Sequence, residues 1–299
     1  MSESTLIILR ESLLSRERIL IVGDIGTGKT RALFDLAELA IANNHKVFFF
    51  SLDDGHQRFL PRMKDHIGSK FFTYNCTCWA EMRAAYKESK NLWEKGDWVM
   101  MDRLDLAWDY IQRFYKAEKY GVSEDELSGF TLDRRLELLT QADELEKKGD
   151  VRSARSIRNA VNMDGPIEMD WDLLKSAMGS VTYEVASGRD AIQYGINYAA
   201  TTWGVAGIQA RMSVGENKSE TDASKNDPRK LRLFNITIQG EKHVPGYFDT
   251  VLVFKKLPQG YVMSTEKDRE RKAFNDELIS GGFADTYSAL VGVDIFGGG

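Results

Sequence analysis

The segment GDIGTGKT, residues 23–30, stands directly after the apolar run ILIV at residues 19–22 and before a stretch with apolar residues at helical spacing. Its glycines at the first and sixth positions, followed by lysine and threonine, match the pattern G-x-x-x-x-G-K-[ST]. Glycines allow consecutive backbone N–H groups to turn toward a phosphate, and the N-terminus of the following helix adds partial positive charge. With a strand before it and a helix after it, the segment predicts a loop that binds the phosphates of a nucleotide.

The residues of this loop have different expected roles. In this pattern Lys29 reaches the β and γ phosphate oxygens, and the hydroxyl of Thr30 is a ligand for Mg²⁺. We therefore expect a nucleoside triphosphate and Mg²⁺ to bind here. The residues expected to bind the nucleotide are Gly23, Asp24, Gly26, Thr27, Gly28, Lys29, Thr30 and Arg31.

The composition and the N-terminal sequence give no sign of a highly basic nucleic-acid-binding protein, a secreted protein or a membrane-spanning protein. The 299 residues are 42% hydrophobic and 28% charged, and the formal net charge is -5. These values are typical of a soluble globular protein, and any polyanion must therefore be bound by a local patch. The N-terminal sequence MSESTLIILRESLL has neither the basic start of a signal peptide nor an apolar run that spans a membrane. We expect a cytoplasmic protein without membrane contact.

Apolar runs typical of buried strands alternate along the chain with helical patterns. This alternation predicts an α/β fold with a mainly parallel central sheet flanked by helices. Residues 103–162 differ because they are helical in pattern and highly charged throughout. We predict a discontinuous core formed by residues 1–120 and 165–275, a charged helical insertion at 121–164 and a C-terminal tail at 276–299.

A second acidic group is expected near the magnesium ion. The strand WVMMD, residues 98–102, is apolar until it ends at Asp102. An aspartate at the end of such a strand holds Mg²⁺ in nucleotide hydrolases that use this phosphate loop. Thr30 and Asp102 are therefore the predicted metal ligands. The alternative is that Asp102 caps the helix that follows it.

Hydrolysis also needs a group that orients or deprotonates water. The sequence KVFFFSLDDG reads as a strand at 46–52 that ends in two acids, Asp53 and Asp54. Because the carboxyl ends of parallel strands share one edge of the sheet, either acid is a candidate catalytic base. The alternative is a solvated acidic turn before Gly55.

The segment Ser51-Leu52-Asp53-Asp54 resembles the S-L-E-E pattern of RecA-like P-loop ATPases, with aspartate in place of glutamate. In that family the pattern ends the strand beside the P-loop, and its first acid is the catalytic base. The C-terminal region, with GEKHVP at 240–245, FDTVLVF at 248–254 and GYVMSTEKDRER at 260–271, is similar to phage-encoded RecA-like AAA-domain proteins. The resemblance implies ATP as the nucleotide, the host cytoplasm as location, and a role in phage DNA recombination, single-strand annealing or replication.

The same resemblance implies further site residues. In RecA-like hexamers a K-x-R pair after a late strand reaches the γ-phosphate of the neighbouring subunit, and Lys267 and Arg269 occupy the matching positions. The pair would neutralise charge during phosphoryl transfer and implies a homo-oligomer. The alternative is a solvated charged run. Thr201 and Thr202 end the strand INYAATTW, where the family presents a polar sensor, and Thr202 is the predicted sensor.

A long polar stretch without periodicity occupies residues 211–230. In RecA-like proteins the equivalent segment contacts single-stranded DNA, and loops of this length are usually functional or disordered. Its lysines and arginines can bind phosphates, although its acids nearly balance them and it contains no aromatic residue for base stacking. Single-stranded DNA is therefore a possible partner, and a flexible surface loop is the alternative.

The sequence as a whole predicts a Mg²⁺-dependent ATPase that acts on nucleic acid. Two alternatives stay open: a nucleotide-switched oligomeric scaffold with little turnover, and a helicase or packaging motor. The scaffold stays an alternative because the side chain of Asp53 is shorter than that of the glutamate in the family pattern and reaches less far toward a bound nucleotide. The predicted catalytic residues are Lys29, Asp53, Asp54, Asp102, Thr202, Lys267 and Arg269.

Overall fold

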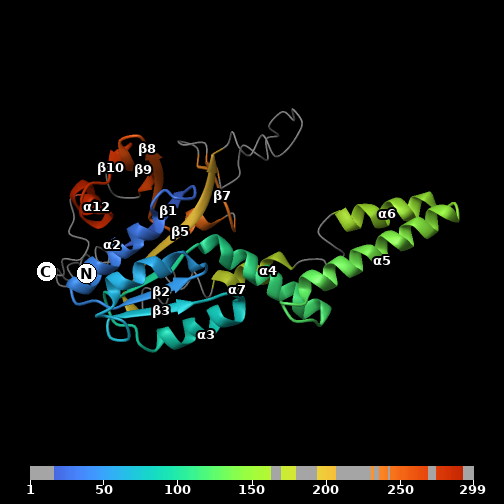
Figure 1. Ribbon diagram of the computed structural model, residues 1–299, viewed down its shortest axis with the longest axis horizontal. Helices are drawn as coiled ribbons and strands as arrows, with labels where there is room; N and C mark the ends of the chain where they lie inside the picture. Colours follow the sequence, from blue (N-terminus) through green and yellow to red (C-terminus); the bar gives the residue numbers. More distant parts are fainter. Residues whose placement is uncertain are drawn as a thin grey trace, which may run out of the picture. The chain divides into compact units, whose positions relative to one another are not determined.

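A computed structural model of the chain describes residues 17–162, 170–179, 194–206, 230–231, 236–241, 243–268 and 274–291. The chain divides into two compact units. The first contains residues 1–108 and 178–299, and the second contains residues 109–177. Figure 1 shows the helices and strands of both units.

The first unit is built on one large sheet with the strand order β10-β9-β8-β1-β5-β4-β2-β3. Strands β8, β1, β5, β4, β2 and β3 pair in parallel, whereas β9 and β10 are antiparallel. The predicted α/β fold with a mainly parallel central sheet is thereby confirmed. The bounds are β1 Arg18–Gly23, β2 Val47–Ser51, β3 Phe71–Asn75, β4 Trp98–Asp102, β5 Asn197–Ala206, β8 Thr250–Leu257, β9 Gly260–Asp268 and β10 Glu277–Leu278.

Two short strands extend the sheet at the C-terminal end of β5. Strand β7 (Ile236–Ile238) pairs antiparallel with β5 at Gly204 to Ala206, and β6 (Lys230–Leu231) pairs antiparallel with β7. Gly204 is required at this point because a Cβ there would lie 2.5 Å from Val22 Cγ1 and 2.7 Å from Ile236 Cγ2. At Gly204, β5 therefore lies in close contact with both the P-loop strand β1 and β7.

The central strands are buried on both faces, as their continuous apolar runs predict. All five residues of β2 and all five of β4 are buried. Phe49 belongs to the core cluster on one face, while Phe48 stacks on Phe72 and lies against Trp93. This alternation places successive side chains of β2 on opposite faces of the sheet.

Helix α2 (Lys29–Ala42), the 3₁₀ helix η1 (Asp54–Met63) and helix α12 (Phe283–Val291) contribute to the same core cluster. Phe283 and Tyr287 of α12 are buried, and α12 packs against α2 (Figure 1). The described part of the predicted tail, residues 276–291, thus completes the core on this face. Helix α3 is Trp79–Lys90, and its Tyr86 packs edge-on against Trp93.

One prediction about the sheet is wrong. The strand that ends in Asp53 was expected to lie beside the P-loop strand, but β5 and β4 lie between β2 and β1. The run VFFFS specifies burial on both faces, and this burial is equally satisfied at several positions of a parallel sheet. The connection from β1 to β2, which contains α2, crosses the positions of β5 and β4, and β2 then pairs with β4 on one side and β3 on the other.

The second unit is helical and contains most of α4 (Leu104–Tyr120), α5 (Leu127–Lys147), α6 (Val151–Asn162) and most of α7 (Trp171–Gly179). Helices α5 and α6 pack as a hairpin in which Arg158 pairs with Asp143 and Glu146. On α5, the side chains of Leu132, Leu136 and Leu139 are exposed. Among the described helices, none combines the length and apolar character that a membrane crossing requires.

Candidate functional site

The P-loop joins β1 to α2 and has the backbone that its glycines predict. Gly26 and Gly28 have φ angles of 75° and 93°, which favour glycine. A Cβ on Gly23 would lie 2.6 Å from the Thr27 hydroxyl oxygen and 2.8 Å from the carbonyl oxygen of Phe254. The loop is therefore a tight backbone cradle at a helix N-terminus, and this geometry fits a phosphate group.

Lys29 extends from the first turn of α2 back across this loop. Its ammonium nitrogen donates hydrogen bonds of 2.8 Å to the carbonyl oxygens of Gly23 and Asp24. Burial lowers the pKa of Lys29, and the nearby carboxylate of Asp102 opposes this shift. The cation is thus held at the loop, where it can contact phosphate oxygens that the loop binds.

Asp102 ends β4 with its carboxylate between two hydroxyl groups. Thr30 Oγ1 donates to Asp102 Oδ2 at 2.8 Å, and Thr201 Oγ1 donates to Asp102 Oδ1 at 2.6 Å. Asp102 is only 1% exposed, and this burial raises its pKa. Both carboxylate oxygens bond to hydroxyls of other elements rather than to N–H groups of α4, an arrangement that favours the metal interpretation over the helix cap.

A buried carboxylate beside a P-loop hydroxyl has the chemistry of a Mg²⁺ site. Mg²⁺ prefers oxygen ligands and is usually held by one or two carboxylates together with substrate phosphates. Thr30 and Asp102 would supply the protein oxygens, and the ion would neutralise charge on the phosphates. The described residues contain no cluster of three or more histidine, cysteine or acidic side chains that would suggest another metal centre.

The two candidate bases after β2 face different partners. Asp53 Oδ1 accepts a hydrogen bond from Gly55 N at 2.9 Å, and its Oδ2 lies 3.4 Å from the guanidinium of Arg103. Asp54 Oδ1 instead accepts from Gln57 Nε2 at 3.2 Å and Asn75 Nδ2 at 3.3 Å. Asp53 is therefore linked to the residue that follows Asp102, whereas Asp54 is directed toward η1 and β3.

Arg103 is a further residue of the candidate site, and no motif in the sequence predicts it. Its guanidinium pairs with Asp105 at 2.8 Å and with Asp53 at 3.4 Å, and the bonds to Asp105 raise its pKa. Its backbone has a φ of 67°, which is unusual for a residue other than glycine. The signal available in the sequence is an arginine between two acids, Asp102 and Asp105, at the end of a buried strand.

Trp203, in the C-terminal half of β5, connects Asp105 to the P-loop. Its backbone N–H donates to Asp105 Oδ1 at 3.2 Å, and its indole N–H donates to Asp24 Oδ1 at 3.1 Å. The indole hydrogen bond is the main reason that the pKa of Asp24 is lowered. A chain of polar contacts thus runs from Asp24 through Trp203, Asp105 and Arg103 to Asp53.

The structure separates the two threonines of β5. Thr201 bonds to Asp102 and also accepts a hydrogen bond from Arg103 N at 2.9 Å. Thr202, the predicted sensor, donates to the carbonyl oxygen of Gln239 at 3.3 Å. Successive side chains alternate along a strand, so only one of two adjacent threonines can face Asp102, and that residue is Thr201.

The predicted trans-acting pair lies only partly within the described residues. Lys267 Nζ donates to the carbonyl oxygens of Pro245 at 2.9 Å and Phe248 at 2.6 Å. Arg269 lies outside the described residues, as does the predicted DNA loop except for Lys230 in β6. The structure therefore brings together the P-loop, Asp102, Thr201, Arg103 and Asp53 as one candidate site.

Neither a protein-family model nor a curated protein matches the sequence. Several solved structures are similar to the chain. One is a DnaB-like replicative helicase, described with its interactions with primase, with a TM-score of 0.40 and 8% sequence identity. The match covers 90% of this chain but only 56% of the helicase chain. A KaiC-like protein from the hyperthermophilic archaeon Pyrococcus horikoshii OT3 has a TM-score of 0.34 and 12% identity over 86% of this chain and 81% of that chain.

Proposed function

We propose that the protein is a Mg²⁺-dependent ATPase with a RecA-like core that acts in nucleic-acid handling. The role that the sequence resemblance implies is phage DNA recombination, single-strand annealing or replication in the host cytoplasm. The observation that carries the ATPase proposal is the position of the buried Asp102 carboxylate, 2.8 Å from the P-loop hydroxyl of Thr30. A phosphate loop and a metal-binding carboxylate are two essential parts of a phosphoryl-transfer site.

Asp53 is the proposed catalytic base. Its carboxylate is one-third exposed, so water can reach it, while Gly55 N and Arg103 fix its orientation. Asp53 would orient the attacking water toward the γ-phosphate, and Lys29 would stabilise the charge that develops on the phosphate oxygens. Asp54 is the second candidate and is engaged by Gln57 and Asn75.

An oligomer is part of the proposal because the candidate finger residues Lys267 and Arg269 would act on a neighbouring subunit. Lys267 is the penultimate residue of β9, which lies two strands from β1, and in its own subunit it bonds to backbone carbonyls. In the proposed assembly these cations would reach the γ-phosphate bound by the next copy. Charge neutralisation of this kind contributes strongly to phosphoryl transfer.

Single-stranded DNA is the proposed nucleic-acid partner. The candidate DNA loop at 211–230 follows β5, the strand that carries Thr201 and Trp203 of the nucleotide site. A change in these contacts on nucleotide binding would therefore reach the loop directly along one strand. A nucleotide-switched scaffold and a helicase or packaging motor are the alternative functions, and both share the same nucleotide site.

Phosphate release measured with Mg²⁺ and ATP, alone and with single-stranded or duplex DNA, tests the proposal. The Lys29→Ala variant serves as the blank. Stimulation by single-stranded DNA supports the proposed role. ATP binding with slow turnover that no DNA stimulates favours the scaffold, and turnover that depends on duplex ends or forks favours the motor.

A further inference from the structure

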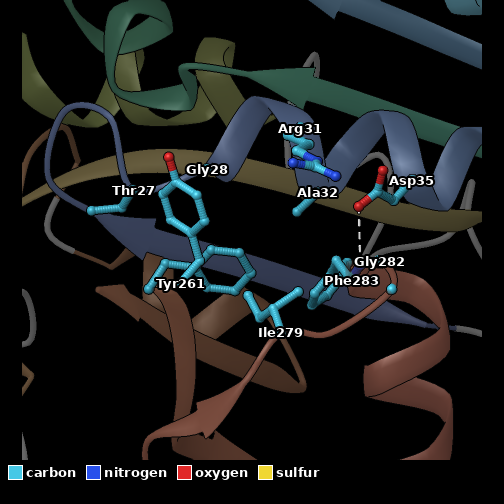
Figure 2. A pocket seen from close by; sticks show the side chains of 11 residues that line it. Thr27, Gly28, Arg31, Ala32, Asp35, Tyr261, Ile279, Gly282 and Phe283 are labelled. Atoms are coloured by element: carbon cyan, nitrogen blue, oxygen red, sulfur yellow. Dashed lines mark hydrogen bonds between the residues drawn. The ribbon is translucent and has the colours of Figure 1, made fainter. Parts of the chain in front are cut away.

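A cavity of about 130 Å³ lies beside the P-loop, between the start of α2 and the C-terminal strands (Figure 2). Its lining includes Gly28, Arg31 and Ala32 from the P-loop and α2, and Tyr261 from β9. The segment from β10 to α12 adds a wall that contains Ile279 and Phe283, and Phe254 of β8 is also part of the lining. Residues of the predicted tail thus stand next to the phosphate-binding loop.

The walls of this cavity are mainly flat and apolar. The ring of Tyr261 lies against the junction of the P-loop and α2, since a Cβ on Gly28 would be 3.6 Å from Tyr261 Cδ1. Figure 2 shows this ring directed toward Gly28, with Ile279 and Phe283 on the same side of the cavity. A slot lined by an aromatic ring and aliphatic side chains fits a planar heteroaromatic group.

The slot is held open by the backbone of the C-terminal segment. Ile279 N donates to the carbonyl oxygen of Tyr261 at 2.9 Å, and Phe283 N donates to Asp35 Oδ2 at 3.0 Å. Between these bonds, Gly281 and Gly282 have positive φ angles and carry no side chain that would fill the space. The segment is therefore fixed to both β9 and α2.

The polar groups of the slot are largely engaged within the protein. Asp35 Oδ1 accepts from Arg62 at 2.7 Å while its Oδ2 accepts from Phe283 N, and the Thr27 hydroxyl donates to the carbonyl oxygen of Asp24. Arg31 is exposed, and among the described residues its side chain makes no hydrogen bond or ion pair. A guanidinium group such as that of Arg31 can stack on the plane of a base, but stacking does not distinguish one base from another, which requires hydrogen bonds to the base edge.

We propose that this slot binds the base of the nucleotide, that Tyr261 is its stacking surface, and that it selects purines by shape rather than by hydrogen bonds to the base edge. The inference rests on the proposed nucleotide function and deepens it, because it predicts that adenine and guanine nucleotides bind alike. It also gives the C-terminal segment 279–283 a role in nucleotide binding. A pyrimidine offers less surface for stacking and binds more weakly.

Calorimetric titration of the full chain with ADP, GDP, CDP and inorganic pyrophosphate, each with Mg²⁺, tests this proposal. For the wild type we expect ADP and GDP to bind within about tenfold of each other and both to bind more tightly than CDP. Tyr261→Ala should weaken ADP and GDP by roughly 10- to 100-fold, the range expected for loss of one base–aromatic stack, and should leave pyrophosphate unchanged. Tyr261→Phe should bind all four ligands as the wild type does.

Tyr115→Ala, in the helical unit, is the matched control and should bind all four ligands normally. Unchanged ADP binding by Tyr261→Ala would overturn the base slot, and so would an equal loss of ADP and pyrophosphate. A preference of more than about 100-fold for one purine over the other would overturn selection by shape. In each of these cases, normal pyrophosphate binding by the wild type leaves the P-loop function intact, whereas failure of the wild type to bind any of the four ligands overturns the proposed function and the slot with it.

Discussion

The hydroxyl of Thr30 lies 2.8 Å from the carboxylate of Asp102, although the two residues are 72 positions apart in the chain. Thr30 ends the P-loop, which follows β1, and Asp102 ends β4. Strand β5 lies between β1 and β4 in the sheet. Thr201 of β5 completes the contact from the other side of the carboxylate at 2.6 Å. Three elements therefore converge on one buried acid, and this convergence is the basis of the proposed Mg²⁺ site.

Asp102→Asn is expected to abolish Mg²⁺-dependent hydrolysis while leaving the fold intact. Burial raises the pKa of Asp102, so the ionised carboxylate costs stability in the folded state. The asparagine variant should therefore melt at a higher temperature than the wild type at neutral pH. The hydroxyls of Thr30 and Thr201 can rotate to suit the amide, so no buried group loses its partner.

The pH dependence of this stability difference follows from the direction of the pKa shift. A group whose folded pKa is raised contributes stability below its unfolded pKa, and this contribution is lost as the pH rises through the folded value. The advantage of Asp102→Asn should therefore vanish near pH 4 and grow toward neutrality, which thermal melts without Mg²⁺ across about pH 4 to pH 8 would reveal. Equal melting temperatures at neutral pH would contradict the burial argument.

Asp53→Asn should reduce steady-state hydrolysis by roughly 10²- to 10⁴-fold with little change in ATP affinity, because it removes the proposed base. Asp54→Asn should retain most of the activity, since its carboxylate is directed toward Gln57 and Asn75. Phosphate release and nucleotide binding measured on both variants distinguish the two acids. The reverse ranking of their activities would assign the role to Asp54.

Arg103→Gln should slow hydrolysis by about tenfold or more, because the guanidinium that positions Asp53 is lost while the P-loop is unchanged. Nucleotide affinity should stay close to that of the wild type, so the effect falls on turnover rather than on binding. Arg83→Gln, on the exposed face of α3, is the matched control. Normal turnover by Arg103→Gln would show that Arg103 has only a structural role, through its ion pair with Asp105.

Two glycine substitutions should change stability in opposite directions. Gly28→Ala places a Cβ on a residue with a φ of 93°, which should destabilise the protein by about 1–2 kcal/mol and weaken nucleotide binding. Gly129→Ala lies in the exposed part of α5 with open space around the new Cβ, and should stabilise the helical unit by about 0.5–1 kcal/mol. Denaturant unfolding compares the two variants with the wild type, and a stabilised Gly28→Ala would contradict the backbone argument.

Much of the fold and part of the site could be predicted from the sequence because local signals carry them. The pattern GDIGTGKT determines a strand, a glycine-rich turn and a helix within one continuous segment, and WVMMD marks a buried strand that ends in an acid. Both predictions depend on neighbouring residues, and the structure has β1 before the P-loop, α2 after it and β4 ending at Asp102, as these signals predict.

The remaining features depend on contacts between residues distant in sequence. The order of strands placed β5 and β4 between β1 and β2, and the apolar runs of these strands contain no information on that order. Arg103 acquires its role only when β2 and β4 pair and bring Asp53 within 3.4 Å. The alternation of Thr201 and Thr202 depends on the phase of β5, which the sequence INYAATTW does not determine because both faces of the strand are buried.

Steady-state release of phosphate from ATP by the wild type, Lys29→Ala and Asp102→Asn tests the central claim most directly. We predict turnover by the wild type that requires Mg²⁺ and a loss on the order of 10²- to 10³-fold or more in both variants. The Asp102→Asn variant should still bind ATP. Equal activity of wild type and Asp102→Asn, or turnover by the wild type that is independent of Mg²⁺, would contradict the assignment of this site as a Mg²⁺-dependent ATPase.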